Sequence, residues 1–277
     1  MYRLHLSLRF LSHHWLMTLI GSFFVGASLV ILVVVMAIMD GFQEELKGTI
    51  RGSGADVTLI PRYPVDLPRL QSVLLDVLTP SVEAAAPFQR TVSFARREGH
   101  VDRALDEAMH FTQVCDVDGR LEQRLNRFGE YIESPFSNRE AFLDDPFRVP
   151  DAMERAMGTV GVIVGVDLMK ELRVAPGDKV RLFAIVGSDD GNGSDDPSQY
   201  SFRYELFQIV GTYRSGNSDI DRRVVFMDLA RFAEFFDAGA SRPSVRLRLR
   251  SGLELKDIRS RLQEQRPRIV RDSVMSG

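Results

Sequence analysis

Hydrophobic positions are concentrated in one segment near the start of the chain. From Leu16 to Met39 no residue is charged, a run of about 24 residues where about 20 suffice to cross a bilayer. As a helix rising ~1.5 Å per residue, this run is ~36 Å long. A soluble helix is rarely apolar on every face over such a length, so the pattern predicts a transmembrane helix over residues 15–39.

Small residues inside this run also imitate a signal-peptide cleavage site, from Val25 to Ala27. Cleavage there would leave a mature N-terminus that begins with a long apolar stretch, so an uncleaved anchor is the better interpretation. Arg3 and Arg9 precede the span, and acidic residues follow it directly. Because basic flanks stay in the cytoplasm, residues 1–14 are predicted to form a cytoplasmic amphipathic segment, with the bulk of the chain outside the cytoplasm.

Two small residues in the span, Ser22 and Gly26, are four positions apart. This spacing places them on one face of a helix, where another transmembrane helix can approach closely. They are therefore candidate residues for transmembrane packing, although a single match of this kind is also compatible with merely permissive packing.

The helical pattern continues beyond the span. Phe42, Leu46 and Ile50 extend an apolar stripe, while charged residues occupy other faces. Gly52 and Gly54 then end the pattern. This predicts a stiff stalk helix over residues 40–54 between the span and the rest of the chain.

Short strands alternate with short helices over residues 55–266, which indicates one extracytoplasmic core domain of the α+β class. Helices are predicted at 67–78, 119–127, 150–157, 167–173, 229–236 and 255–264. Strands are predicted at 82–86, 91–97, 110–116, 161–164, 179–185, 204–213, 224–227 and 245–249, after a first β-branched segment at 56–60. Residues 128–149 have no clear period and are predicted as an irregular insertion, and residues 267–277 as a C-terminal tail.

The sequence shows none of the usual catalytic motifs. A phosphate-binding G-x-x-x-x-G-K-[ST] loop, a G-x-G-x-x-G turn and a G-x-S-x-G nucleophile motif are all missing. The net charge of −3 provides no basic field for nucleic acid. We therefore expect no enzyme activity, no catalytic residue, no cofactor and no nucleic-acid partner.

Two further features could indicate a ligand site. The single cysteine, Cys115, cannot supply the paired ligands of a structural zinc site. The acidic loop from Ser188 to Tyr200 contains oxygen ligands that calcium prefers, but its spacing differs from a calcium-binding loop. A solvated hairpin explains the loop better, so no metal site is expected.

The span and the stretch after it carry a resemblance. The segment VVVMAIMDGFQEELKGTIRGSGADVTLI resembles the first transmembrane helix and stalk of ABC permeases of the lipoprotein-releasing (LolC/LolE) and MacB-like type. The segments GVIVGVDLMKELRVAPGDKVRLF and FQIVGTYRSGNSDIDRRVVFMDLARF are similar to later elements of the same family. The residues that fit the family's M-[DN]-G-F-x-x-E-L stretch, and that we therefore expect to couple the stalk, are Met39, Asp40, Gly41, Phe42, Glu45 and Leu46.

This resemblance implies a single-pass protein of the cell inner membrane with a MacB-like core domain outside the cytoplasm. It implies two partners besides the lipid bilayer, a cytoplasmic ABC ATPase subunit that hydrolyses ATP and a second permease subunit. The expected function is to couple the ATPase-driven motion of helices to the core domain, for lipoprotein release or export. Family permeases carry three further spans after the core domain and this sequence shows none, so the chain is expected to be a truncated, split or partner form. The alternative is a single-pass anchored ectodomain that binds a partner or envelope component without an ATPase.

Overall fold

A computed structural model describes residues 15–62, 65–98, 109–156, 158–187, 200–236, 243–250 and 255–273. The chain divides into two units, Met1–Ile50 and Arg51–Gly277, which are considered separately below.

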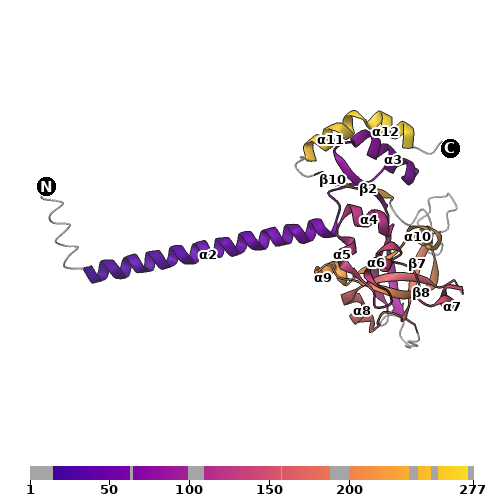
Figure 1. Cartoon of the computed structure of the whole chain (residues 1–277), viewed down its shortest axis with the longest axis horizontal. Coiled ribbons are helices and arrows are strands. Elements are labelled where there is room, and N and C mark those ends of the chain that lie inside the picture. Colours follow the sequence, from indigo (N-terminus) through magenta and orange to yellow (C-terminus); the bar gives the residue numbers. More distant parts are fainter. Residues whose placement is uncertain are drawn as a thin grey trace. The chain divides into compact units, whose positions relative to one another are not determined.

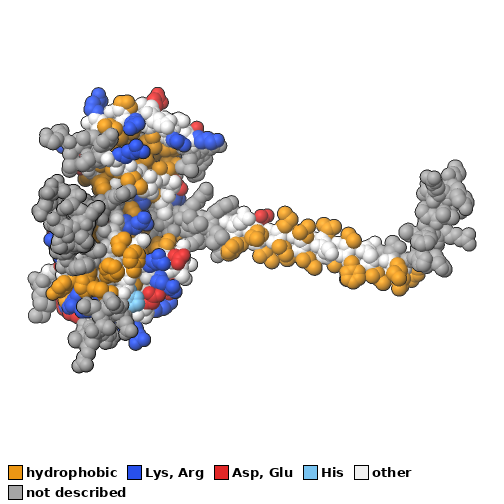
Figure 2. All heavy atoms as spheres, turned by 180° about the vertical axis from the view of Figure 1, so that it is seen from behind, with side chains coloured by type: hydrophobic (Ala, Val, Ile, Leu, Met, Phe, Trp, Pro, Cys, Tyr) orange, Lys and Arg blue, Asp and Glu red, His pale blue; other side chains and the backbone are white. Residues whose placement is uncertain are grey.

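The first unit is built on one long helix, α2 (Trp15–Ser53). Within the described residues, its part Trp15–Gln43 is the one helix that is long and apolar enough to cross a membrane. Large hydrophobic side chains are exposed along this part, and they cover much of its surface in Figure 2. Such a surface is unfavourable in water and favourable in hydrocarbon, which agrees with the predicted span. The helix continues without a break through the predicted stalk as far as Ser53.

The second unit contains a small antiparallel sheet in the order β1-β10-β2. Its strands are β1 (Val57–Leu59), β2 (Val82–Phe88) and β10 (Ser244–Leu249). One face of the sheet is covered by α3 (Leu67–Leu78), which buries Leu70, Leu74 and Leu78 at helical spacing. The helices α11 (Leu255–Glu264) and α12 (Arg266–Ser273) pack beside α3 (Figure 1).

A larger mixed sheet follows the order β5-β8-β6-β9-β4-β3-β7. Strand β7 pairs with both β3 and β8, so this sheet closes on itself around an apolar core. Its strands are β3 (Arg90–Arg97), β4 (His110–Val117), β5 (Ile132–Glu133), β6 (Val160–Gly165), β7 (Lys179–Gly187), β8 (Tyr200–Tyr213) and β9 (Val224–Asp228). The helices of this part are α4 (Gly119–Leu125), α5 (Phe128–Tyr131), α6 (Arg139–Asp144), α7 (Ala152–Ala156), α8 (Val166–Leu172), α9 (Ser218–Asp221) and α10 (Leu229–Phe235).

This mixture of helices and strands confirms the predicted α+β class, and two local predictions need correction. Residues 128–149 are not an irregular insertion, because they form α5, β5 and α6 and bury Phe128, Ile132 and Phe142 in a core cluster. The predicted tail at 267–277 begins instead with most of α12, whose Arg268 forms an ion pair with Asp76 of α3.

Candidate functional site: a buried polar joint and an exposed aromatic row

The residues predicted for transmembrane packing lie on the exposed surface of α2. Ser22 and Gly26 are one helical turn apart, and a Cβ atom added to Gly26 would meet nothing within 4 Å. This face is therefore open to another helix, as close packing requires. The packing role itself stays a prediction.

The residues predicted for stalk coupling lie further along the same helix. Met39, Asp40, Gly41 and Phe42 are all exposed on α2. Glu45 and Leu46 are also on α2, but their side chains lie outside the described part of the structure. The coupling role of these residues also stays a prediction.

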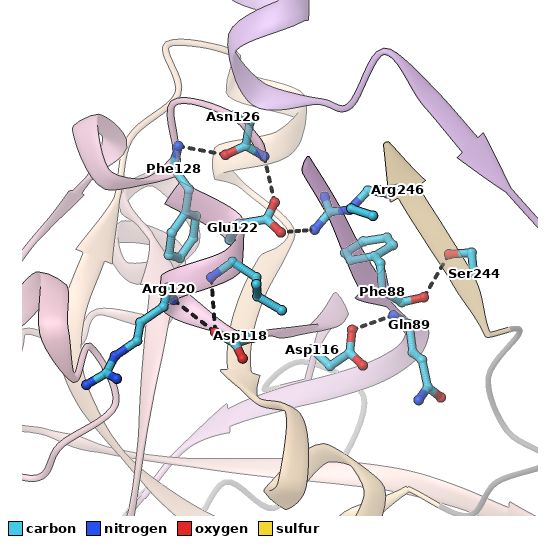
Figure 3. A network of polar contacts seen from close by, with 12 residues as sticks. Phe88, Gln89, Asp116, Asp118, Arg120, Glu122, Asn126, Phe128, Ser244 and Arg246 are labelled. Atoms are coloured by element: carbon cyan, nitrogen blue, oxygen red, sulfur yellow. Dashed lines mark hydrogen bonds and ion pairs between the residues drawn. The ribbon is translucent and has the colours of Figure 1, made fainter. Parts of the chain in front are cut away.

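A buried polar joint connects the small sheet to α4 in the second unit, and the sequence analysis did not find it. Glu122 of α4 forms an ion pair with Arg246 of β10, and their side chains are only 3% and 9% exposed. The Arg246 guanidinium also stacks on Phe88, 3.6 Å from the ring centroid. Asn126 donates a hydrogen bond from Nδ2 to Glu122 at 2.6 Å (Figure 3). The charges of Glu122 and Arg246 therefore neutralise each other, as buried charges require, although Arg246 Nε has no hydrogen-bond partner among the described residues.

Local structure explains why the side chains of Glu122 and Arg246 meet. Asp118 caps α4, because its carboxylate accepts hydrogen bonds from the backbone N–H groups of Arg120 and Leu121. Along β10, Val245 and Leu247 point into the core under α3, so Arg246 faces the opposite side, where α4 contacts the sheet. The alternation along β10 was visible in the sequence, but nothing in the sequence showed that α4 covers the second face.

Asp116 secures the point where the chain passes from the small sheet to the large one. Its carboxylate accepts a hydrogen bond from the backbone N–H of Gln89, and its own N–H donates to the Gln89 carbonyl at 3.1 Å. Ser244 donates to the carbonyl of Phe88 at 2.7 Å. These bonds tie β2, β4 and β10 together at one crossing of the chain.

Burial governs the ionisation of the acidic groups around the joint. It raises the pKa of Asp116 to about 7, against the hydrogen bond from Gln89 and the charge of Arg246. Burial also raises the pKa of Glu122, and Arg246 opposes this shift most strongly. Among the described residues, Asp116 Oδ2 has no hydrogen-bond partner, which adds to the cost of its ionised form.

The groups at the joint do not form a recognisable reaction centre. Burial raises the pKa of Cys115 to about 12, so this residue is a neutral thiol rather than a nucleophilic thiolate. No three histidine, cysteine or acidic side chains of the described residues lie close enough together to hold a metal ion. The arrangement is suited to holding the small sheet and α4 in one orientation.

An exposed aromatic row crosses the outer face of the large sheet. Register pairs Phe111 with Phe94, Phe94 with Phe183, and Phe183 with Tyr204 over four adjacent strands. Phe111 is 46% exposed and Tyr204 is 62% exposed. Neighbouring arginines lie over two of the rings, with Arg181 5.1 Å from the centroid of Tyr204. Aromatic and arginine side chains are enriched at protein interfaces, so this row is a candidate contact surface.

The chain matches one family model and is similar to several solved structures. A family model for the MacB-like periplasmic core domain matches residues 23–265. No curated protein matches the chain. Among solved structures, the periplasmic region of MacB from Actinobacillus actinomycetemcomitans is 7% identical, with a TM-score of 0.43, and the match covers 76% of this chain and 82% of that one. The extracellular domain of the noncanonic ABC-type transporter YknZ from Gram-positive bacteria is 9% identical, with a TM-score of 0.39, and covers 80% of this chain and 100% of that one.

The family assignment rests on the family model, which spans most of the chain from within the apolar helix to the end of α11. It confirms the MacB-like part of the resemblance, while the likeness to the lipoprotein-releasing branch stays a prediction. With its apolar N-terminal helix, the chain is indicated to be membrane-anchored with an extracytoplasmic domain. The chain belongs to the family of the MacB-like periplasmic core domain.

Proposed function

We propose that this chain is a permease-like membrane subunit of an ABC transporter, whose helix α2 transmits motion driven by a cytoplasmic ATPase to the extracytoplasmic domain. Its N-terminus lies in the cytoplasm and α2 crosses the inner membrane once. The observation that carries the proposal is the match to the MacB-like family in a chain whose apolar span and stalk form one unbroken helix.

The continuity of α2 supports a mechanical role. Successive turns of an α-helix are joined by backbone hydrogen bonds, so displacement at one end moves the other. A flexible glycine linker would dissipate the same displacement. The sequence of α2 contains no proline that would break this ladder.

The chain itself then contributes no ATP hydrolysis, and both the ATPase and a second permease subunit are separate partners. The exposed Ser22–Gly26 face offers a contact for a neighbouring span. The exposed aromatic row offers a contact for another protein outside the membrane. Lipoprotein release or export is the function that the resemblance favours for such an assembly.

Two measurements test the proposal. The chain is first purified from native membranes in mild detergent, where we expect a stoichiometric ATPase subunit to accompany it. If no ATPase is bound, the result favours the anchored ectodomain that binds an envelope component instead.

The second measurement inserts two residues after Phe42 in α2 and follows ATP hydrolysis and transport together. A Gly-Gly insertion is expected to leave ATP hydrolysis intact and abolish transport, because each glycine weakens the helix by about 1 kcal/mol. An Ala-Ala insertion is the matched control, since it adds the same length and the same turn of about 200° but keeps the helix stiff. Unchanged transport with Gly-Gly would refute the relay. Equal loss with both insertions would show that helix phase matters and stiffness does not.

A further inference from the structure

An apolar pocket of about 430 Å³ lies in the second unit beside the small sheet, and the proposed relay does not use it. Its walls come from the end of β1 and the segment that follows it, and from α3, α11 and α12. Leu70 and Leu74 of α3 are buried at its inner end. Ile60 and Val270 also line it, and these side chains are 60% and 39% exposed. The pocket therefore opens to solvent through hydrophobic side chains, which costs free energy unless something covers them.

Polar contacts hold the walls of the pocket in place. The backbone N–H of Asp66 donates to the carbonyl of Ser273 at 3.2 Å, which fixes the end of α12 to the start of α3. Arg268 of α12 forms an ion pair with Asp76 of α3 at 2.7 Å. These two contacts join α12 to α3 beside the pocket.

Two arginines at the pocket have no acidic partner in the described part of the chain. Arg62 and Arg266 line the pocket and are exposed, and neither forms an ion pair with any of the described residues. Their neighbours differ, because Arg69 is paired with Asp66 and Arg268 with Asp76. The pocket thus combines an apolar interior with unpaired positive charge.

The apolar interior and the two arginines together decide which class of ligand fits the pocket. An extended peptide would bring backbone N–H and C=O groups that an apolar lining cannot satisfy. The hydroxyl of Ser273 is already used, because it donates to the carbonyl of Ile269. A hydrocarbon chain has no such requirement, and a negative head group would complement Arg62 and Arg266. The volume lies near the low end of the range for ligand pockets, roughly 300–1,000 Å³, which suits one chain better than two.

We propose that this pocket binds the acyl chain of a single-chain anionic lipid, with the chain between α3 and α12 and the carboxylate or phosphate at Arg62 and Arg266. The site lies in a protein indicated to be membrane-anchored, so such lipids are available to it. Binding of this kind does not require an ATPase.

The proposal is tested on the full chain in nanodiscs of zwitterionic phosphatidylcholine. The probe is palmitic acid carrying a photoactivatable group near its methyl end, and the neutral comparison is the matching monoglyceride. After illumination, peptide mapping by mass spectrometry is expected to place the fatty-acid label on α3 and α12. The monoglyceride is expected to give about tenfold less label, the factor that corresponds to losing two charge contacts.

Three variants separate the pocket from other labelling. Reversing both charges with Arg62→Glu and Arg266→Glu is expected to reduce fatty-acid labelling by more than about tenfold, because the new glutamates also repel the fatty-acid carboxylate. Val270→Trp should reduce it by covering the opening, whereas Arg259→Glu, an exposed arginine of α11 outside the lining, should leave it unchanged. Thermal melts by circular dichroism identify any variant that fails to fold.

Equal labelling by fatty acid and monoglyceride would overturn the proposal, as would label confined to α2. Because this measurement contains no ATPase, its failure leaves the proposed transport role untouched, and failure of the ATPase to co-purify leaves this lipid site untouched.

Discussion

Removal of Arg246 from the buried joint is expected to destabilise the second unit strongly. In Arg246→Met the carboxylate of Glu122 remains only 3% exposed but loses its cation, and the stacking on Phe88 changes as well. Breaking a buried ion pair on one side costs about 3–5 kcal/mol. For a domain of this size each kcal/mol shifts Tm by about 2–4 °C, so Tm should fall by roughly 6–20 °C.

A matched control lies on the same helix. Arg120 of α4 forms an ion pair with Asp144 at 2.7 Å, but these side chains are 73% and 69% exposed. Surface pairs contribute at most about 1 kcal/mol, so Arg120→Met should lower Tm by only about 4 °C or less. A double variant, Glu122→Leu with Arg246→Met, removes both charges and should regain most of the lost stability.

The assay is differential scanning calorimetry of the full chain in nanodiscs. Tryptophan fluorescence is unsuitable, because the single tryptophan, Trp15, is at the start of α2 and does not report on the joint. If Arg246→Met lowers Tm no more than Arg120→Met does, the reasoning about the buried pair is wrong. The same conclusion follows if the double variant is as unstable as the single one.

Three further predictions concern single residues. Burial raises the pKa of Asp116 from 3.8 to about 7, so the folded state loses stability as the pH rises from about 4 to about 7 and loses no more above that. Asp116→Asn should remove a loss on the order of 2 kcal/mol between pH 5 and 7, measured by chemical denaturation. Gly165→Ala should cost about 3 kcal/mol in the same assay, the upper end of the usual range for overpacking, because its Cβ would lie 2.1 Å from the carbonyl oxygen of Asp221. Gly129→Ala is the control, since its Cβ would meet only side-chain atoms and should cost less. Gly26→Leu should weaken association between spans severalfold, measured by energy transfer in vesicles, and an equal effect of Gly21→Leu would contradict the proposed packing face.

Much of the fold follows from local patterns. The helix predicted at 67–78 is α3, since Asp66 supplies the cap, Pro68 suits the first turn, and Leu70, Leu74 and Leu78 supply the buried stripe. The strand predicted at 179–185 is β7, which extends to Gly187. It could be predicted because inward and outward side chains alternate along it. Elements that are long, or whose hydrophobic positions repeat regularly, could therefore be predicted from the sequence without tertiary information.

The segment 128–149 could not be read in this way. The elements α5, β5 and α6 span only four, two and six residues. These lengths are too short for the helical or the strand repeat of hydrophobic positions to be recognised. Its side chains are ordered by the tertiary core instead, where the Phe128 ring stacks on Tyr213 and meets Phe226 edge to face, both on distant strands. Asn138, which caps α6, was a local signal of a helix start.

The joint between Glu122 and Arg246 was beyond sequence reasoning for a different reason. The two residues are 124 positions apart, and charged residues on a short helix and a strand are normally solvated. Only the packing of α4 against both β2 and β10 removes water from this face. The acidic loop at 188–199 lies outside the described residues, so the expectation of a solvated hairpin there stays a prediction.

The chemistry of the joint has a consequence for the proposed relay. The hydrophobic effect is non-directional, so apolar contacts fix the orientation of two surfaces only through the fit of their side chains. A guanidinium bonded to a carboxylate and stacked on a ring has one geometry, and displacement of β10 along α4 would lose both contacts together. The Glu122–Arg246 pair then fixes the orientation of β10 on α4 rather than adding stability, since apolar side chains in place of both residues can give an equally stable fold. The double variant Glu122→Leu with Arg246→Met should therefore melt near the wild-type temperature and still transport less, and full transport by that variant would show that the domain does not need a fixed orientation of its small sheet.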